Sequence, residues 1–565
     1  MILGIDLGTT NSAVGLWTNE GPVLIPNSLG DLLTPSAVSI ADDGALLVGM
    51  AARERQVTHP QMTATTFKRY MGSTRSTRLG SLNLSPEELS SLVLRSLKAD
   101  AETYLGDQVD KAVITVPAYF SDRQRKATVK AGQLAGLNVE RLVNEPTAAA
   151  LAYGIQNLEE ETPFLMFDLG GGTFDVSLIQ IFDGVVEVRA SAGDNRLGGE
   201  DFNDALIALA VEKLQDPRVS DQAGGVLRQT LRAAAERTRR ALSDADQAAF
   251  AFVWRDQSYQ VDIWADDFER QVSGLIDRLR APVLQALRDG SIKAEQLGEI
   301  VLVGGATRMP IIRKAVTRMF GRFPSNALHP DHAIALGAAV QAGLRSKGEG
   351  LDEIRMTDVC PYTLGIDVGE RLSGGRFRSG LFQPIIERNT VVPASRMRSF
   401  TTISDNQTVV RFGVYQGEAR EVASNIELGS VSIAVPPKAA GHVEVQCRFS
   451  YDISGLLEVD ILVPETGEAR QLVIVDDGTP GEALDARRRV LADLKIHPRD
   501  EDANAAVLAR AARCYEAFIG EERAFVAQLI SMFQAALDDQ DHRVIAKVRS
   551  SVEAALNQLE GERYL

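Results

Sequence analysis

One stretch constrains the fold of this chain more than any other: Phe164-Leu-Met-Phe-Asp-Leu-Gly-Gly-Gly-Thr-Phe-Asp175. Its apolar beginning predicts a buried strand that ends in an aspartate and three glycines, and Val176 to Phe182 predicts the returning strand. Glycines at such a hairpin tip let several backbone N–H groups point at one ligand, as phosphate oxygens require. Asp168 beside them suits a hydrated magnesium ion.

The start of the chain repeats this arrangement. Met1-Ile-Leu-Gly-Ile-Asp-Leu-Gly-Thr-Thr-Asn-Ser12 is again followed by a predicted strand, Ala13 to Trp17. Two such halves, around Asp6 and Asp168, can face each other across a cleft and hold one polyphosphate between them. Neither glycine cluster is followed by Lys-Ser or Lys-Thr, so a P-loop is excluded.

Further glycine-rich turns follow predicted strands. Gly193 to Asp201 precedes a helix, and Ile300-Val-Leu-Val-Gly-Gly-Ala-Thr-Arg-Met-Pro310 leads from a strand into another. A helix N-terminus behind two glycines is a natural anion or ribose site, and Arg308 could lay its guanidinium plane on a base. Glu145 follows the strand Glu140 to Val143 at the start of a helix, where its carboxylate could reach the cleft.

Other charged residues have a plainer interpretation when taken alone. Glu236, Arg239, Arg240 and Ser243 share one face of a predicted helix, and such a stripe is usually solvated. Lys68 is one lysine among many, and by default a surface charge. His329 and His332 form a loop pair that is more often structural than metal-binding.

The bulk properties limit the class of protein. A chain of 565 residues with 45% hydrophobic and 24% charged residues predicts a globular protein of two to four domains. The net charge of −16 argues against nucleic-acid or anionic-membrane surfaces. Cys360, Cys447 and Cys514 show neither disulfide nor metal spacing, which suits a reducing cytoplasm. Neither a signal peptide nor an apolar run of membrane-spanning length is apparent.

The pattern of apolar and polar residues changes along the chain and divides it into regions. Residues 1–350 alternate strands and amphipathic helices, which predicts an α/β domain, and residues 351–358 are unpatterned, which predicts a linker. Residues 359–479 show short alternating strands and predict a β-sandwich. Residues 480–565 show helical periodicity, with two apolar stripes that begin at Phe525 and Val544 and are expected to pack on each other or on the β-domain.

Six segments together resemble the signatures of DnaK-type chaperones, the heat shock protein 70 family, and occur in that family's order. They are GIDLGTTNSAV, VITVPAYFSDRQRKAT, NEPTAAALAYG, FDLGGGTFDVS, GDNRLGGEDF and LVGGATRMP. The resemblance covers residues 1 to about 475. The shortened regions after Gly72 and Ser243, with the segment DVCPYTLG, look closest to the HscC branch.

The resemblance implies an actin-like, two-lobed ATPase domain of duplicated ribonuclease-H-like fold, a β-sandwich that binds peptides, and an α-helical lid. It implies that Asp6 and Asp168 hold magnesium through water, and that Lys68, Glu145, Asp168 and Thr173 serve hydrolysis. The positions that it assigns to ATP or ADP are Gly8, Thr9, Thr10, Asn11, Gly170, Gly171, Gly172, Thr173, Gly198, Gly199, Glu200, Glu236, Arg239, Arg240, Ser243, Gly304, Gly305, Arg308 and Asp331.

The same resemblance assigns residues to communication and to client binding. Pro117 and Arg125 match an interdomain relay, and Arg141, Asn144, Thr147 and Asp358 match a docking site for J-domain proteins. The peptide groove would be lined by Ile366, Phe400, Ile403, Val410 and Phe412.

Departures from the family pattern also matter. The linker Ile354-Arg-Met-Thr-Asp358 is more polar than is usual, the small upper subdomains are truncated, and Gly369 replaces a common methionine. These differences put the usual nucleotide exchange factor in doubt and predict a narrow range of client polypeptides.

We therefore expect a monomeric, ATP-driven chaperone of the cytoplasm that works with a J-domain co-chaperone. We expect no nucleic-acid or membrane partner. An actin-like filament or scaffold protein, or a sugar or acetate kinase, would share the cleft but lack the sandwich and lid. A regulator that binds nucleotide without cycling is disfavoured because Lys68, Glu145 and Thr173 are all present.

Overall fold

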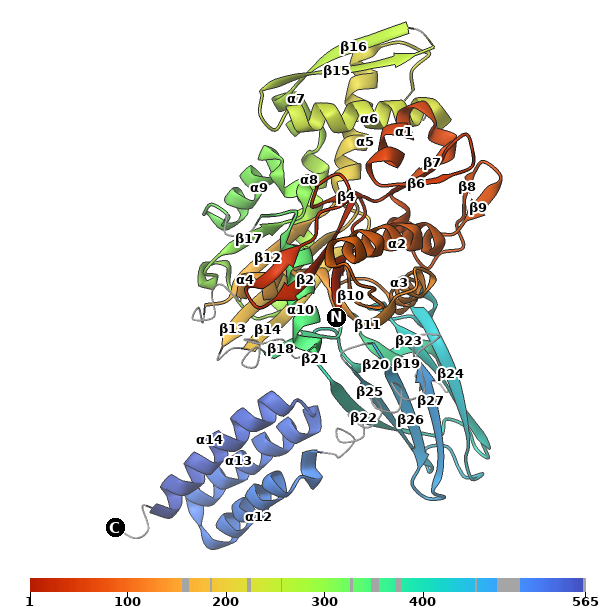
Figure 1. Cartoon of the computed structure of the whole chain (residues 1–565). Helices are drawn as coiled ribbons and strands as arrows, with labels where there is room; N and C mark the ends of the chain where they lie inside the picture. The colour runs from red at the N-terminus through yellow and green to blue at the C-terminus, as the bar shows by residue number, and fades with distance from the viewer. Residues whose placement is uncertain are drawn as a thin grey trace. The chain divides into compact units, whose positions relative to one another are not determined.

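The computed structural model describes residues 1–154, 162–182, 185–220, 225–255, 257–325, 329–346, 355–371, 377–452, 455–474 and 498–561. The chain divides into two compact units, one from Met1 to Tyr362 and one formed by the described residues from Thr363 onward (Figure 1). No helix in these ranges is both long enough and apolar enough to cross a membrane. The domain boundaries at 350, 358 and 479 stay predictions.

The first unit begins with a lobe built on a mixed sheet, here called the first lobe. Its strand order is β11-β10-β1-β2-β3, with bounds Asn138–Asn144, Lys111–Val116, Leu3–Asp6, Asn11–Thr18 and Gly21–Leu24. β1 runs parallel to β10 and antiparallel to β2. The remaining elements of this lobe are β4 (Thr34–Pro35), β5 (Ala37–Ile40), β6 (Leu46–Val48), β7 (Thr63–Thr65), β8 (Thr77–Leu79), β9 (Leu82–Leu84), α1 (Met50–Thr58), α2 (Pro86–Leu105) and α3 (Asp122–Leu134).

The second lobe repeats the same strand–turn–strand plan. Its sheet contains β17-β12-β13-β14 in that order, with bounds Ile300–Val303, Phe164–Leu169, Phe174–Phe182 and Val185–Asp194. β12 runs parallel to β17 and antiparallel to β13, which matches the relation of β1 to β10 and β2. Around it lie α5 (Gly199–Leu214), α6 (Gly225–Ala241), β15 (Gln247–Trp254), β16 (Gln257–Trp264), α7 (Ala265–Gln271), α8 (Ser273–Asp289) and α9 (Pro310–Phe320).

Each lobe has its own apolar core. Leu3, Ile5 and Ile114 are fully buried in the first lobe, and Phe167 and Phe174 in the second. The strand β12 is buried along its whole length, as its apolar sequence predicts. The two lobes also touch where α1 of the first lobe packs against α6 of the second (Figure 1).

Two helices join the lobes. α4 (Glu145–Gly154) packs on β13 of the second lobe, α10 (Ala333–Arg345) packs on β1 and β2 of the first, and the two helices pack on each other. Every residue of α4 is buried, which its alanine-rich sequence permits on all sides. A methyl group on Gly337 of α10 would lie 1.6 Å from the carbonyl oxygen of Ala148. The two backbones therefore approach as closely as glycine and alanine allow.

The end of the predicted linker is not a loop. Arg355–Val359 forms β18, which runs parallel to β14 with Val185 opposite Arg355 and Glu187 opposite Thr357. These residues form a strand despite their unpatterned sequence, because the edge of β14 supplies backbone partners that do not depend on side-chain pattern, and their assignment to a linker stays a prediction. Leu351 to Ile354 lie outside the described residues.

The second unit contains two antiparallel four-stranded sheets and a group of helices. One sheet has the order β20-β19-β23-β24, with bounds Phe377–Ile386, Leu364–Arg371, Val409–Gln416 and Ile426–Ala434. The other has the order β22-β25-β26-β27, with bounds Ala394–Thr401, Glu444–Tyr451, Leu457–Val463 and Glu468–Ile474. The alternation of apolar residues predicted strands at Thr408–Tyr415, His442–Tyr451, Leu456–Val463 and Ala469–Val475, which match β23, β25, β26 and β27 to within two residues at each end. The other four strands were not predicted individually.

The helices of the second unit are α12 (Asp502–Ala517), α13 (Gly520–Asp539) and α14 (His542–Gly561), and they share one apolar core. Leu529 and Phe533 lie in this core, as their predicted stripe requires, but Phe525 and Val544 are exposed. Val526 and Ile545 are buried instead, because each stripe begins one residue later than the sequence suggested.

The contact between α4 and α10 generates the first prediction. Gly337→Ala should lower the free energy of unfolding of the first unit by about 1–3 kcal/mol, since the added methyl group meets backbone that cannot move aside. Urea unfolding followed by tryptophan fluorescence measures this unit alone, because all three tryptophans (Trp17, Trp254 and Trp264) belong to it. Gly274→Ala in α8, where nothing lies within 4 Å, is the matched control and should be neutral or stabilising. Equal stability of the two variants would contradict the packing argument.

Candidate functional site

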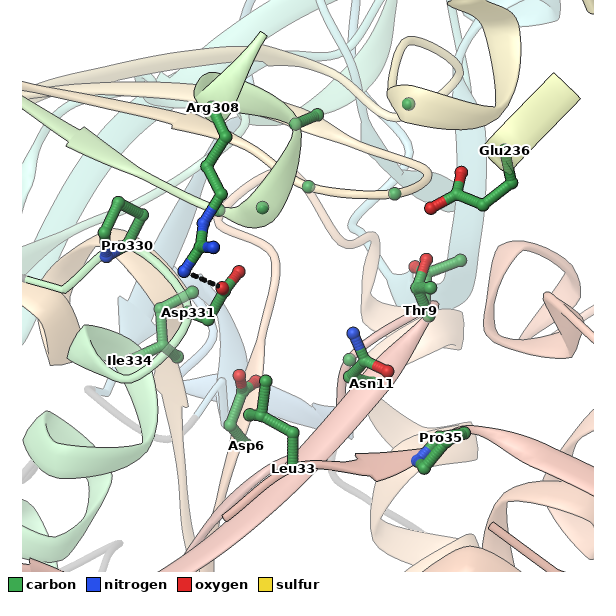
Figure 2. A pocket seen from close by; sticks show the side chains of 18 of the residues that line it. Asp6, Thr9, Asn11, Leu33, Pro35, Glu236, Arg308, Pro330, Asp331 and Ile334 are labelled. Carbon is green, nitrogen blue, oxygen red and sulfur yellow. Dashed lines mark ion pairs between the residues drawn. The ribbon is translucent and has the colours of Figure 1, made fainter. Parts of the chain in front are cut away.

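A cavity of about 940 Å³ lies in the first unit, where residues from both lobes meet (Figure 2). Its lining includes all of the residues predicted for nucleotide, metal and hydrolysis except Gly172 and Gly198, which lie in the same turns. Lining residues that were not assigned to the nucleotide site from the sequence are Gly30, Asp31, Leu32, Leu33, Pro35, Met50, Arg53, Asn203, Asp244, Ala306, Pro330, His332 and Ile334. The lobes thus bring together segments that are more than three hundred residues apart in sequence.

The two predicted phosphate turns form one wall of this cavity. The turn after β12 is closed by a hydrogen bond from the Gly170 N–H to the Thr173 carbonyl oxygen (3.0 Å). In the turn after β1, the Gly8 N–H donates to Ser12 Oγ (3.1 Å). The turns approach each other so closely that a methyl group on Gly171 would lie 2.0 Å from Thr10 Oγ1. The backbone of both turns therefore faces the same space.

A buried ion pair lies at the centre of the cavity. Lys68 Nζ is 2.6 Å from Glu145 Oε1, and the two side chains are only 4% and 8% exposed. Lys68 comes from the short helix η2 (Phe67–Tyr70) of the first lobe, and Glu145 is the first residue of α4. The interpretation of Lys68 as a solvated surface charge is wrong, because η2 folds its side chain inward.

Three further carboxyl groups surround this pair. Burial and the charge of Glu145 raise the pKa of Asp6 to about 7, although Lys68 and a hydrogen bond from Thr115 act in the opposite direction. Burial and the Glu145 charge likewise raise the pKa of Asp175 to about 8 and that of Asp168 well above its usual range. Oδ2 of Asp168 is buried and accepts no hydrogen bond from any described residue. One lysine does not offset this much negative charge, so the cluster is suited to a cation.

The far end of the cavity is lined by α6. Glu236 accepts from Arg239 (2.6 Å), Arg240 (2.8 Å) and Asn203 (3.1 Å). Burial alone would raise the pKa of Glu236, but the two arginines outweigh it and lower this pKa to about 2. The solvated-stripe interpretation of α6 is therefore wrong for this face, which lines the cavity together with Ser243.

Across from α6, the segments after β17 and before α10 contribute a second group. Arg308 Nη2 is 2.6 Å from Asp331 Oδ2 (Figure 2). The same Nη2 contacts His329 Nε2 at 3.1 Å. The His329 ring stacks on that of His332 at 3.9 Å between centroids, and no three His, Cys, Asp or Glu side chains among the described residues are arranged to ligate a metal ion directly. Arg308 and Arg240 are both about half-exposed, so two guanidinium groups stand at the mouth of the cavity.

A chain of polar contacts connects β18 with the start of α4. Arg125 Nη2 donates to Asn144 Oδ1 (2.7 Å), and Asn144 Nδ2 donates to Asp358 Oδ2 (2.8 Å). Thr147 Oγ1 also reaches Asp358 (3.5 Å), whose pKa is raised by burial. Asn144, Thr147 and Asp358 are buried in this arrangement, and their assignment to a docking site for J-domain proteins stays a prediction. Arg141 is partly exposed, and Pro117 accepts a backbone bond from Phe120 before α3.

Four of the predicted groove residues lie in the sandwich strands of the second unit, and Ile403 follows the end of β22. Ile366 and Phe412 are buried, Phe400 and Val410 are partly exposed, and Ile403 is 49% exposed. The rings of Phe400 and Phe412 lie 5.8 Å apart, which joins the two sheets at this point. The apolar character predicted for these positions is thus present, with Ile403 the most accessible.

Besides the lining residues Asp31, Arg53 and Asp244, sequence reasoning missed two charged residues that lie near the cavity without lining it. Asp175 stands opposite Asp168 in the hairpin and was visible as the last residue of the glycine-rich stretch. Arg69, in η2, forms a hydrogen bond to Asp201 of the second lobe. No sequence motif around Arg69 predicts this contact.

Taken together, two lobes of repeated strand order, joined by α4 and α10 around paired Asp-Leu-Gly turns, define an ATPase of the actin-like class, here followed by a β-sandwich and a helical region. The family described as "Hsp70 protein" matches residues 2–564. The chain is 40% identical over 516 residues to the "Chaperone protein DnaK" of Thermotoga neapolitana, and equally to those of Thermotoga petrophila and Thermotoga maritima. Each alignment covers 88% of this chain and 84% of the relative.

The chain therefore belongs to the Hsp70 family and is of the DnaK type. Members of this family are ATPases that couple ATP hydrolysis to the binding of client polypeptides, so the predicted ATP-dependent chaperone is confirmed. The alternatives of a scaffold protein and of a sugar or acetate kinase are thereby excluded.

The buried ion pair generates a prediction about stability and pH. Lys68 lowers the pKa values of the surrounding carboxyl groups, so Lys68→Met should raise them further above their unfolded values. The folded variant then holds more protons than the unfolded chain, and its stability falls more steeply as pH rises. We expect its deficit in unfolding free energy relative to wild type to grow from about pH 5 to about pH 8, reaching about 3–5 kcal/mol.

Urea unfolding followed by tryptophan fluorescence at each pH measures this deficit. Lys98→Met is the matched control, because Lys98 forms an exposed pair with Glu102 on α2 (3.9 Å). Its deficit should stay below about 1 kcal/mol at every pH. A deficit of Lys68→Met that does not change with pH would show that the carboxyl cluster does not respond to this lysine.

Proposed function

We propose that the cavity binds ATP with its phosphates on the two glycine turns, and that Lys68, Glu145, Asp168 and Thr173 position and polarise the attacking water. The observation that carries the proposal is the buried Lys68–Glu145 pair beside the Gly170–Thr173 turn. Phosphoryl transfer depends mainly on positioning and charge stabilisation, which a rigid buried cation and acceptor supply.

Magnesium fits the same site. Asp6 and Asp168 present carboxylates from the ends of β1 and β12, and the unpartnered oxygen of Asp168 is available for an ion or its water. Burial first, and then the neighbouring charge of Glu145, raise the pKa values of both groups, and a divalent cation would offset both effects. Bound magnesium would offset the charge of the phosphates, and Asp6 and Asp168 would hold it through water molecules.

The adenosine end follows from the charged groups around α6. Glu236 is held ionised by its arginine partners, so it can accept hydrogen bonds from ribose hydroxyl groups. The half-exposed guanidinium groups of Arg240 and Arg308 can stack on a purine ring from opposite sides. Ser243 and Asp331 complete this end, and Gly304, Gly305 and Gly199 bring backbone close to the nucleotide, with Gly198 in the turn beside Gly199.

We further propose a specialised member of the HscC-like branch with a narrow range of clients. A groove lined by Ile366, Phe400, Ile403, Val410 and Phe412 suits an extended hydrophobic segment. Gly369 in β19 lacks the side chain that would arch over such a segment, and Ile403 and Phe412 reduce the depth available. Generic leucine-rich peptides should therefore bind weakly.

The remaining assignments rest on the family and on composition. We propose that a J-domain protein acts on this chaperone through Arg141 and the Asn144–Thr147–Asp358 network, with Pro117 and Arg125 as relay. Since three of these residues are buried, such a partner would bind when β18 rearranges. Three buried cysteines that form no disulfide suit the cytoplasm, and we propose a monomer whose exchange factor differs from the usual one.

Removing one hydroxyl tests the catalytic part of the proposal. Thr173→Ala should slow single-turnover ATP hydrolysis by on the order of 10²-fold while ADP still binds, as expected for loss of one transition-state donor. Thr103→Ala on the exposed face of α2 is the matched control and should leave the rate unchanged. Hydrolysis by Thr173→Ala at the wild-type rate would remove this residue from the mechanism.

A single methionine tests the proposed client range. Gly369→Met should tighten binding of a leucine-rich peptide by roughly tenfold to a hundredfold, the value of burying one further side chain. Fluorescence anisotropy in ADP measures the affinity, and Ala469→Met, which adds methionine at an exposed position of β27, is the control. If wild type already binds such peptides tightly and Gly369→Met changes nothing, the protein is a general chaperone.

A further inference from the structure

We propose that Arg69 is a positioning residue for hydrolysis, which fastens the phosphate turn of the second lobe to the segment of the first lobe that carries Lys68. This inference rests on the proposed role of the cavity in ATP hydrolysis. It concerns a residue that does not line the cavity and acts through Lys68 and Gly172.

The contacts of Arg69 cross from one lobe to the other. Its Nε and Nη2 atoms donate to the carbonyl oxygen of Gly172 at 3.3 and 3.2 Å. Nη2 also donates to Asp201 Oδ2 at 2.6 Å, and the two charged side chains are 20% and 24% exposed. Gly172 lies at the tip of the β12–β13 hairpin and Asp201 in the first turn of α5, so both partners belong to the second lobe.

Asp201 is itself tied to the phosphate turn. The same Oδ2 atom accepts from the Gly198 N–H (2.8 Å) at the N-terminus of α5. Next to it, the N–H groups of Gly199 and Glu200 donate to the carbonyl oxygens of Gly170 and Gly171 (3.0 and 2.9 Å). α5 therefore holds one side of the turn while Arg69 holds the other.

The space around the turn is filled. A methyl group on Gly172 would lie 2.8 Å from Arg69 Nε, and one on Gly198 would lie 2.5 Å from the Gly172 nitrogen. A turn held this tightly keeps its N–H groups in place for phosphate oxygens. It also keeps the neighbouring Thr173 in place for the water.

The position of Arg69 beside Lys68 gives the contact its consequence. Both residues belong to η2, where Lys68 points inward to Glu145 and Arg69 reaches across to Asp201. A movement of η2 away from the second lobe would break the Arg69 bonds and displace Lys68 together with them. Arg69 thus couples the position of Lys68 to that of the phosphate turn, and a misplacement of about 1 Å at a reacting centre can cost on the order of 10²-fold in rate.

The test compares Arg69→Ala and Arg69→Lys with wild type in the full chain. Single-turnover ATP hydrolysis, ADP affinity and urea unfolding by tryptophan fluorescence are measured for each. We expect Arg69→Ala to slow hydrolysis by about 10- to 100-fold and to weaken ADP binding by less than about threefold. Arg69→Lys should recover part of the rate, because a lysine keeps the charge facing Asp201 but not the forked contact with Gly172.

Two further variants sharpen the result. Arg69→Ala combined with Asp201→Asn should be no slower than Arg69→Ala alone, since both remove the same contact. Arg55→Ala is the matched control, because Arg55 pairs with Asp42 at 3.2 Å within the first lobe and forms no hydrogen bond or ion pair with a described residue of the second. It should leave hydrolysis unchanged.

The outcomes separate this inference from the proposed function. If wild type does not hydrolyse ATP, the proposed function fails. If wild type hydrolyses ATP and Arg69→Ala does so equally fast, only the role of Arg69 is overturned. A loss of ADP affinity as large as the loss of rate would make Arg69 a binding residue and would also overturn it, as would equal rates for Arg69→Lys and Arg69→Ala.

Discussion

The close approach of α4 and α10 is the constraint on which the rest of the first unit depends. The Gly337–Ala148 crossing brings the helix that lies on the first sheet against the helix that lies on the second. Because α4 begins at Glu145, its position also sets the acceptor of the central ion pair and, through Asn144, the partner of Asp358. Small side chains at one crossing therefore govern the distance between the lobes, the centre of the cavity and the attachment of β18.

Electrostatics explains why the cavity is suited to nucleotide and metal. At one end of the cavity, carboxyl groups whose pKa values are raised to about 7 and about 8 surround Lys68. At the other end, Glu236 lies among arginines that lower its pKa to about 2. The first arrangement has an excess of carboxyl groups, whereas in the second the glutamate is paired with two arginines whose faces stay available. The two ends thus differ in what they can bind, as the proposed phosphate–metal end and base–ribose end require.

Much of this architecture could be predicted from residue patterns. Strand alternation located the sandwich, and the repeated Asp-Leu-Gly turns indicated two facing halves. The limits of prediction lie with residues whose surroundings come from distant segments. Lys68 and the stripe on α6 have ordinary surface patterns, and nothing local distinguishes an arginine that pairs with Asp201 from one that faces solvent. The same limit applies to Phe525 and Val544, where a shift of one residue along a helix exchanges buried and exposed positions.

What the sequence determined by itself is what depends on near neighbours: strands, helices, glycine turns and the family signatures that they carry. What only the tertiary structure decided is which of these elements face one another. β18 forms because the edge of β14 offers it backbone partners. Asn144 and Asp358 are buried together because β18, which carries Asp358, lies against Asn144. Arg69 bonds to Gly172 because α4 and α10 hold the two lobes together. These contacts join residues up to 214 positions apart, and no pattern within a local stretch of chain encodes the partner of such a contact.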